Sequence, residues 1–346
     1  MFQDLTLDEL MELRKKKEYV LIDVRSPSEY EDSTIPGSLN IPFFDDEERA
    51  EIGTLYKQVS AQAAKERGLE IVSAKLPSFI KQFSEIGEQK VVFCWRGGMR
   101  SKTTATVLSL MDIHVHRLTG GIRNYRQWVV SELERVAASF SPVPIVLNGY
   151  TGSGKTELLR RLADRGHPVL DFEAMAGHRG SIFGHIGRKS NNQKKFESIL
   201  IEQLIHHELA PYILFEAESK RIGKVVLPNP MVEMKERAHQ LWLELPLAVR
   251  VHHIMDDYQP WEHHEECLKS FAKIKSRIHT PIAIQIESDL KQSKYPEAIE
   301  QLLLHYYDPR YAHTIAEYES EQRTLIKANN LDEALEQIER FILKSF

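Results

Sequence analysis

The chain has 346 residues, of which 42% are hydrophobic and 27% are charged; this composition is typical of a globular protein, and the length predicts two domains. The sequence has no long apolar run and no N-terminal apolar segment, so we expect no membrane span and no secretory signal. It has only two cysteines, Cys94 and Cys267, so we expect no disulfide framework and a cytoplasmic protein. The net charge of -5 excludes a diffusely basic nucleic-acid binder but is compatible with a local basic patch.

The first part of the chain is predicted to alternate strands with helices. Apolar runs at 19–24 and 91–93 indicate buried strands, and helical patterns between them favour a parallel sheet covered by helices. A helix is expected from Tyr125 to about Ala138. Pro142 and Pro144 end that helix and predict a linker at 141–144. The pattern predicts an α/β domain at residues 1–138.

The second domain, residues 139–346, is also predicted to be α/β. A strand at 145–147 leads into a glycine-rich loop and a helix at 157–163, and further strands are expected at 212–215 and 241–245. From Pro296 onward the chain is expected to be mostly amphipathic helix. This order is typical of a P-loop NTPase-like domain with a helical tail.

The segment 149–156, GYTGSGKT, fits the phosphate-loop pattern G-x-x-x-x-G-K-[ST] at every fixed position. Glycines let the backbone N–H groups turn toward an anion, and the following helix adds its positive end. Lysine adds a charge, and the threonine hydroxyl usually reaches Mg²⁺. We expect phosphate binding by Gly149, Gly152, Ser153, Gly154, Lys155 and Thr156.

An acidic residue that assists Mg²⁺ usually follows a neighbouring strand of such a domain. Glu216 and Glu218 follow the strand at 212–215 and are the candidates. We predict a metal site at Thr156 and Glu218, with Mg²⁺ as an optional ion and no tightly bound cofactor.

The segment 94–101, CWRGGMRS, places Cys94 at the end of the strand at 91–93 and before a helix. Inward N–H groups, the helix N-terminus and the charges of Arg96 and Arg100 favour the thiolate, which is the nucleophilic form. Cys94 and Arg100 are therefore predicted catalytic residues. Cys267 lies in a charged helical stretch without these features and is interpreted as structural or incidental.

No Asp or Glu occurs from Ala174 to Phe196, although this glycine-containing segment has several basic residues. We expect a flexible loop that contacts a polyanion or covers a substrate, with Lys220, Arg221 and Lys224 extending the patch. The basic residues assigned to tRNA or substrate binding are His178, Arg179, Arg188, Lys189, Lys194 and Lys195.

The first domain resembles the rhodanese family. The resemblance rests on LIDVRSPSEY at 21–30, IPGSLNIP at 35–42 and LTGGI at 118–122, and Cys94 occupies the position of the family's catalytic thiol. Five residues separate Cys94 from Arg100, one more than in common rhodanese loops and as in rhodanese-fold phosphatases. The longer loop argues against simple thiosulfate sulfurtransfer.

The whole chain resembles the tRNA 2-selenouridine synthase family, on the combination of both loops with AGHRGSIFG at 176–184. The resemblance implies a reaction on tRNA that carries 2-thiouridine at the wobble position. Geranyl diphosphate first alkylates the sulfur, and selenium from selenophosphate then replaces the S-geranyl group to give 2-selenouridine. It also implies that Cys94 handles selenium through an S-selanylcysteine intermediate, while Trp95 and Arg96 contact tRNA or substrate.

Three other functions are compatible with the same residues. A P-loop kinase or NTPase with a regulatory rhodanese module would turn over nucleotide through Lys155. A rhodanese-fold phosphatase would depend on Cys94. A non-catalytic adaptor would use the basic segment to bind RNA. The sequence also leaves open whether the P-loop holds geranyl diphosphate, which we favour, selenophosphate or a nucleotide.

Overall fold

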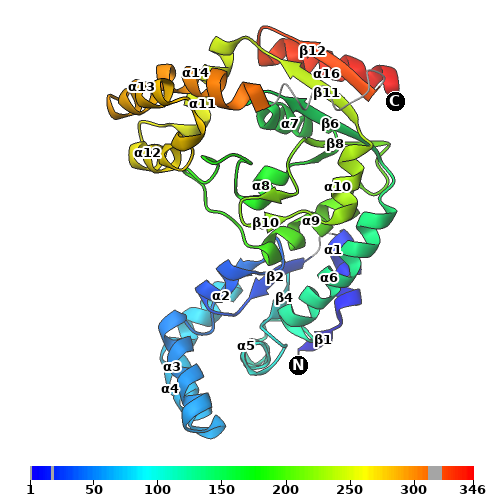
Figure 1. Cartoon of the computed structure of the whole chain (residues 1–346). Helices are drawn as coiled ribbons and strands as arrows, with labels where there is room; N and C mark the ends of the chain where they lie inside the picture. Colours follow the sequence, from blue (N-terminus) through cyan, green and yellow to red (C-terminus); the bar gives the residue numbers. More distant parts are fainter. Residues whose placement is uncertain (1, 17–18, 311–321) are drawn as a thin grey trace. The chain divides into compact units, whose positions relative to one another are not determined.

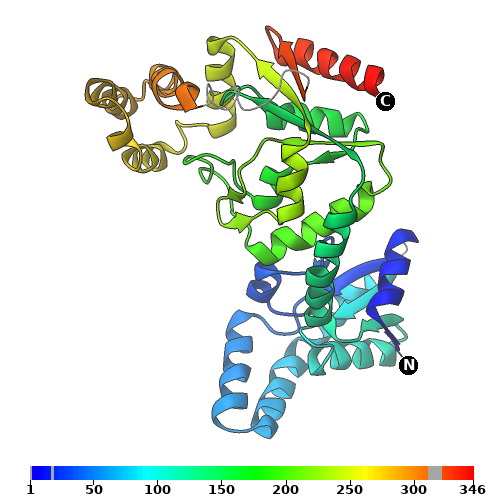
Figure 2. The same ribbon diagram turned by 45° about the vertical axis from the view of Figure 1, so that its right-hand side comes forward.

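The computed structural model describes residues 2–16, 19–310 and 322–346. The chain divides into two compact units, Met1–Leu133 with Glu197–Ile199 and Glu134–Phe196 with Leu200–Phe346. The division after Leu133 falls within helix α6 (Gly121–Ser139). Each unit contains a five-stranded parallel sheet with helices, which confirms the predicted α/β class (Figure 1 and Figure 2).

The sheet of the first unit has the strand order β1-β5-β4-β2-β3. Its central strand is β4, in which Val91, Val92 and Phe93 are completely buried, as expected for a parallel sheet covered on both faces. Both strands predicted here are confirmed. The strands are β1 (Gln3–Leu5), β2 (Tyr19–Asp23), β3 (Leu39–Asn40), β4 (Gln89–Phe93) and β5 (Val115–Leu118).

Two helices of the first unit, α3 and α4, run side by side and extend away from its sheet (Figure 1 and Figure 2). The start of α3 is fixed by a reciprocal pair of hydrogen bonds, because Asp45 accepts from the Glu48 N–H and Glu48 accepts from the Asp45 N–H. The helix predicted from Tyr125 is α6, which begins earlier, at Gly121. The other helices are α1 (Leu7–Lys16), α2 (Pro27–Asp32), α3 (Asp46–Gln58), α4 (Ala61–Ser84) and α5 (Met99–Leu110).

The sheet of the second unit has the order β12-β11-β6-β8-β7, and β9 and β10 form a separate antiparallel hairpin. All three strands predicted in this part of the chain are confirmed. The strands are β6 (Val143–Gly149), β7 (Val169–Leu170), β8 (Tyr212–Glu216), β9 (Arg221–Ile222), β10 (Val225–Val226), β11 (His239–Glu244) and β12 (Arg323–Lys327).

One sequence expectation is corrected in this unit, and another is confirmed with an addition. The segment expected as a linker already contains the start of β6, where Pro144 pairs with Ile213 of β8. Pairing with β11 begins only at Ile145, so Pro144 has a strand on one side only, a position that tolerates its missing N–H. The tail from Pro296 onward is mostly helical in its described part, as expected, and it also contributes strand β12, which pairs with β11 from Arg323 to Lys327.

The helices of the second unit form two groups. One packs on the sheet, where Leu158 and Leu162 of α7 share a core with Ile338 of α16. The other, from α11 to η2, has its own core around Phe271 and Ile286 and lies to one side of the sheet (Figure 1). The elements are α7 (Lys155–Asp164), α8 (Phe172–Ala176), α9 (Gln193–His207), α10 (Asn229–Glu236), α11 (Leu247–Tyr258), α12 (His264–Ala272), η1 (Lys275–Arg277), α13 (Thr280–Lys291), α14 (Tyr295–Leu302), η2 (Leu303–Tyr307) and α16 (Leu331–Ser345).

Among the helices in the described part of the chain, none is long and apolar enough to cross a membrane.

Candidate functional site

The predicted phosphate loop connects the end of β6 to the start of α7, so strand, loop and helix have the expected order. Gly152 and Gly154 have φ angles of 79° and 72°, which favour glycine, and a Cβ on Gly154 would lie 2.5 Å from Leu331 Cδ2. Lys155 Nζ donates to the carbonyls of Gly149 and Tyr150 at 3.1 and 3.3 Å. The loop therefore keeps the lysine ammonium against its own backbone, close to where an anion would bind.

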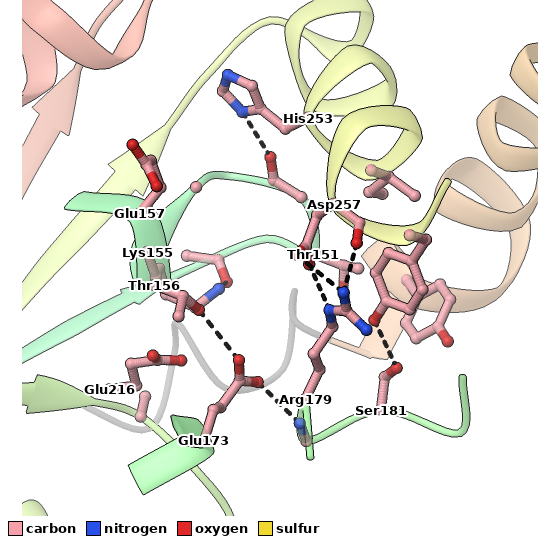
Figure 3. Close-up of a pocket in the computed structure, with 18 of the residues that line it drawn as sticks. Thr151, Lys155, Thr156, Glu157, Glu173, Arg179, Ser181, Glu216, His253 and Asp257 are labelled. Carbon is pink, nitrogen blue, oxygen red and sulfur yellow. Dashed lines mark hydrogen bonds and ion pairs between the residues drawn. The ribbon is translucent and has the colours of Figure 1, made fainter. Parts of the chain in front are cut away.

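A cavity of about 970 Å³ opens over this loop. It is formed by the P-loop, the start of α7, the end of β8, the start of α8 and one face of α11. Figure 3 shows Thr156 beside Glu173, with Glu216 on the same side of the cavity. Five of the six residues predicted to bind phosphate line the cavity, namely Gly149, Gly152, Gly154, Lys155 and Thr156. The sixth, Ser153, is fully buried and does not line the cavity.

Three carboxylates come together beside Thr156. Glu173, Glu216 and Glu218 each offer an oxygen, and these oxygens lie within 4.8 Å of one another. Thr156 Oγ1 donates to Glu173 at 3.1 Å, and the Gly180 N–H donates to the other Glu173 oxygen at 2.8 Å. Glu216 is buried, and its Oε1 has no hydrogen-bond partner among the described residues. An unpartnered buried carboxylate oxygen calls for a proton or a cation.

The proton affinities of this cluster support the same conclusion. Burial raises the pKa of Glu216 well above its ordinary value, and the Glu173 carboxylate raises it further. Burial likewise raises the pKa of Glu218 to about 7 and raises that of Glu173. Ionising all three neighbouring carboxylates in a low-dielectric site is unfavourable because the like charges repel one another. A divalent cation would remove this repulsion, so the cluster is suited to bind one.

The sequence prediction named Glu216 and Glu218 but missed Glu173. Glu173 lies on α8, just after the short strand β7, so it follows the carboxyl end of a parallel strand as the two predicted glutamates do. The run Val169–Leu170 followed by Asp171 and Glu173 was the available signal, since acids after parallel strands gather at one edge of the sheet.

Arg250 of α11 fixes the other side of the P-loop and was also missed. Its two terminal nitrogens donate to both carboxylate oxygens of Asp308 at 2.9 and 2.6 Å, while its Nε donates to the Thr151 carbonyl at 2.9 Å. The guanidinium also lies 5.0 Å from the centre of the Tyr150 ring. Because the Arg250 side chain is only 5% exposed, this pair is a buried support for the loop.

The basic segment does not form one free cationic surface. Arg179, predicted to bind tRNA or substrate, is buried in the wall of the P-loop cavity. Its Nε donates to Asp257 at 2.6 Å, its Nη1 donates to the Ile186 carbonyl at 2.8 Å, and its guanidinium lies over the Tyr258 ring (Figure 3). Arg188 is half-buried and lies 3.5 Å from the same Asp257. Arg179 forms part of the cavity wall, and the charge of both arginines is opposed by the same aspartate.

The remaining predicted contacts of this segment lie apart from one another. His178 is half-buried, its Nδ1 has no partner among the described residues, and burial lowers its pKa. Lys189 is exposed in the turns between α8 and α9, whereas Lys194 and Lys195 belong to the first turn of α9. The expected flexible loop is thus a series of turns that ends in a helix, and its contact with tRNA stays a prediction.

In the first unit, Cys94 follows β4 as predicted and is buried. Its Sγ lies 3.2 Å from the Ser101 hydroxyl. Arg100 donates two hydrogen bonds to Glu29, at 2.5 and 3.2 Å, so its charge is balanced by that carboxylate. Trp95 is 41% exposed and Arg96 is exposed, so both are available to a large ligand.

The loop after Cys94 is held by contacts with residues at the end of β5 and the start of α6, including the LTGGI segment. The Ile122 N–H donates to the Cys94 carbonyl at 3.0 Å, and Arg117 Nη1 donates to the Gly97 carbonyl at 2.8 Å. Gly121 has a φ of 56°, and a Cβ there would lie 2.0 Å from the Cys94 carbonyl oxygen. This close approach explains the second glycine of the LTGGI segment.

The fold and these two loops define a protein with a rhodanese-like thiol site in one α/β unit and a P-loop phosphate site in the other. Residues 6–127 match the rhodanese-like domain, and residues 142–280 match the tRNA 2-selenouridine synthase AAA domain. The chain belongs to the tRNA 2-selenouridine synthase family.

Curated relatives with this name support the assignment over most of the chain. The protein of Nitrosomonas europaea is 34% identical over 292 residues, which cover 82% of this chain and 75% of that protein. Those of Bdellovibrio bacteriovorus and Sulfurovum sp. are 31% and 32% identical, covering 84% and 89% of this chain and 87% and 92% of theirs. A solved N-terminal domain of a putative ATP/GTP binding protein from Clostridium difficile is 32% identical, covering 37% of this chain and 98% of its own, with a TM-score of 0.35.

Proposed function

We propose that this protein modifies the wobble uridine of tRNA, converting 2-thiouridine to 2-selenouridine by way of S-geranyl-2-thiouridine. The observation that carries the proposal is the P-loop cavity, where an ammonium group, a helix N-terminus and a carboxylate cluster suited to Mg²⁺ surround one anion site. We assign this cavity to the diphosphate of geranyl diphosphate and the Cys94 loop to selenium. The family's name supports tRNA as the substrate.

In the first step, a lone pair of the thione sulfur forms a bond to C1 of the geranyl group. The C1–O bond breaks, diphosphate leaves with its electron pair, and the base loses its N3 proton. The groups around Lys155 would stabilise the charge that develops on the departing oxygen, which is the most effective electrostatic contribution a site can make. The loop needs little rearrangement for this, because Arg250 and Asp308 already hold its backbone.

In the second step, selenium bonds to C2 of the base, and geranylthiol leaves with the electron pair of the broken C–S bond. Selenophosphate and water supply the selenium and yield inorganic phosphate. S-alkylation prepares this exchange, because it makes C2 electrophilic and makes the sulfur a better leaving group. We assign the handling of selenium to Cys94, and contact with the tRNA to the exposed Trp95 and Arg96.

We further propose that Mg²⁺ binds at the carboxylate cluster. The oxygens of Glu173, Glu216 and Glu218 lie within 4.8 Å of one another, close enough for all three to approach one small cation. Thr156 would complete the site. When bound, the ion would neutralise part of the diphosphate charge.

The test incubates the protein with 2-thiouridine tRNA, geranyl diphosphate and selenophosphate and identifies the nucleosides by mass spectrometry. We expect Lys155→Ala to impair geranylation, whereas Cys94→Ala spares much of geranylation and blocks selenium incorporation. Each variant controls for the other, and Lys327→Ala, at an exposed lysine of β12, controls for loss of charge. A base that gains neither geranyl nor selenium would refute the proposal.

The same variants separate the alternatives. A kinase or NTPase would turn over nucleotide in a Lys155-dependent and Cys94-independent manner. A phosphatase would release phosphate from an aryl phosphate and lose this activity in Cys94→Ala. An adaptor would bind tRNA in a salt-dependent manner, with neither loop affecting any chemistry.

A further inference from the structure

A second, apolar cavity of about 60 Å³ lies beside the P-loop cavity in the same unit. The two cavities share a wall, since Thr151, Ser181, Ile254, Tyr258 and Tyr307 line both. Thr151 belongs to the P-loop itself, so a molecule that places an anion in the loop has the apolar cavity next to it. The far side is formed by the helical group, with Leu290 of α13 and Ile299 and Leu302 of α14 among its lining residues.

Three of the hydroxyl groups around the apolar cavity already have hydrogen-bond partners. The hydroxyl of Tyr295 lies 2.9 Å from His264 Nδ1, and that of Tyr258 lies 3.1 Å from the Ser181 hydroxyl. None of the described residues that line this cavity has a charged side chain at neutral pH. Burial also raises the pKa of the Cys267 thiol to about 11, so this lining residue stays neutral. The cavity is therefore suited to hydrocarbon and unsuited to a sugar, a nucleobase or selenophosphate.

We propose that this cavity binds the hydrocarbon end of an allylic diphosphate whose diphosphate occupies the P-loop; the proposal rests on the function proposed above. The cavity is small, since 60 Å³ has room for about four to six water molecules at roughly 10–15 Å³ each, and we assign it one short branched hydrocarbon group such as an isoprene unit. The distal isoprene unit of a geranyl group enters the cavity, and the unit attached to diphosphate lies along the shared wall.

The far side of the cavity then sets the chain length. Leu302 is 6% exposed and Leu290 is 4% exposed, so both are packed into the core of the helical group and a third isoprene unit meets them. A farnesyl group has to displace these side chains, which is costly in a close-packed core. Leu290 and Leu302 are thus residues that determine specificity for the ten-carbon chain.

The first test measures binding alone by titration calorimetry, comparing geranyl diphosphate with inorganic diphosphate. We expect geranyl diphosphate to bind at least about tenfold more tightly, the usual value of filling an apolar pocket. Leu290→Phe fills the cavity and should remove most of this difference while leaving the affinity for inorganic diphosphate unchanged. A difference that is absent in the unmodified protein, or that Leu290→Phe does not reduce, would overturn the proposal.

The second test measures transfer of dimethylallyl, geranyl and farnesyl groups to 2-thiouridine tRNA. Leu302→Ala should raise the ratio of farnesyl to geranyl transfer on the order of tenfold or more, because it removes the obstruction to the third unit. Ile286→Ala is the matched control, since Ile286 is buried in the same core but does not line the cavity. It should leave the ratio unchanged; an equal rise in both variants would overturn the proposal.

The two tests separate this inference from the function on which it rests. If binding depends on the cavity as expected but no prenyl group reaches the tRNA, the cavity assignment is supported and the proposed transfer is wrong. If geranyl is transferred but the Leu290 and Leu302 variants change neither the affinity for geranyl diphosphate nor the chain-length preference, the proposed function is supported and the cavity assignment is wrong.

Discussion

The buried ion pair of Arg250 and Asp308 provides a quantitative prediction about the P-loop. We consider Asp308→Ala, which leaves the Arg250 guanidinium without its carboxylate. The arginine side chain is 5% exposed and the aspartate 23% exposed, so the pair is largely but not fully removed from water. Removing one partner of a fully buried pair costs about 3–5 kcal/mol. With the partial exposure of Asp308, we expect about 2–3 kcal/mol of lost stability.

The same change should weaken phosphate binding, because Arg250 Nε holds the Thr151 carbonyl within the loop. We expect the affinity for inorganic diphosphate to fall about tenfold, which is a loss of roughly 1.4 kcal/mol of binding free energy, because the loop would then have to be ordered on binding. Asp308→Asn keeps the shape and a hydrogen-bond acceptor, so its effect should be intermediate.

Denaturant unfolding and titration calorimetry with inorganic diphosphate measure the two effects. The control is Glu336→Ala, which breaks an exposed pair with Arg340 on α16 and should change stability by less than about 0.5 kcal/mol. If Asp308→Ala affects stability no more than the control does and leaves diphosphate affinity intact, other contacts hold the loop and the reasoning is wrong.

Three further predictions follow from the described contacts. Gly121→Ala should destabilise the protein by about 2 kcal/mol or more and lower selenium incorporation, because the added Cβ would clash with the Cys94 carbonyl at a residue with positive φ. Gly87→Ala is the control, since Gly87 has open space around it and the change should affect neither property. Thermal unfolding and the nucleoside assay measure the two effects. Alkylation of Cys267 by iodoacetamide in a Cys94→Ala background should be slow at neutral pH and accelerate up to about pH 11, because the raised pKa of this thiol leaves little thiolate at lower pH. An alkylation rate that is already maximal at pH 8 would contradict this prediction. Glu216→Gln should weaken Mg²⁺ binding measured by calorimetry, and equal Mg²⁺ affinity in both proteins would argue against the proposed ion site.

The sequence by itself determined the fold class, the main strands and both reactive loops. The P-loop and the Cys94 loop are contiguous segments whose residue types follow from local backbone requirements, so they can be recognised without tertiary contacts. The strands at 91–93 and 212–215 were recognisable for the same reason, since a strand buried on both faces is a short continuous apolar run.

Only the tertiary structure decided which charges meet. Arg100 pairs with Glu29 and Arg250 pairs with Asp308, in each case across long stretches of chain, and Arg179 is buried against Asp257 although its segment appeared to be a free basic loop. A local pattern gives the number of charges but not their partners, which depend on the elements that the fold brings together.

The tertiary structure also completed the P-loop cavity, with Glu173 as the third carboxylate and an apolar neighbour formed by α11 to η2. The apolar residues of these helices follow an ordinary amphipathic pattern, and the sequence does not distinguish those that fill a core from those that line a cavity. The physical reason is that a cavity depends on how side chains from several helices pack, whereas a motif depends on the backbone of one segment.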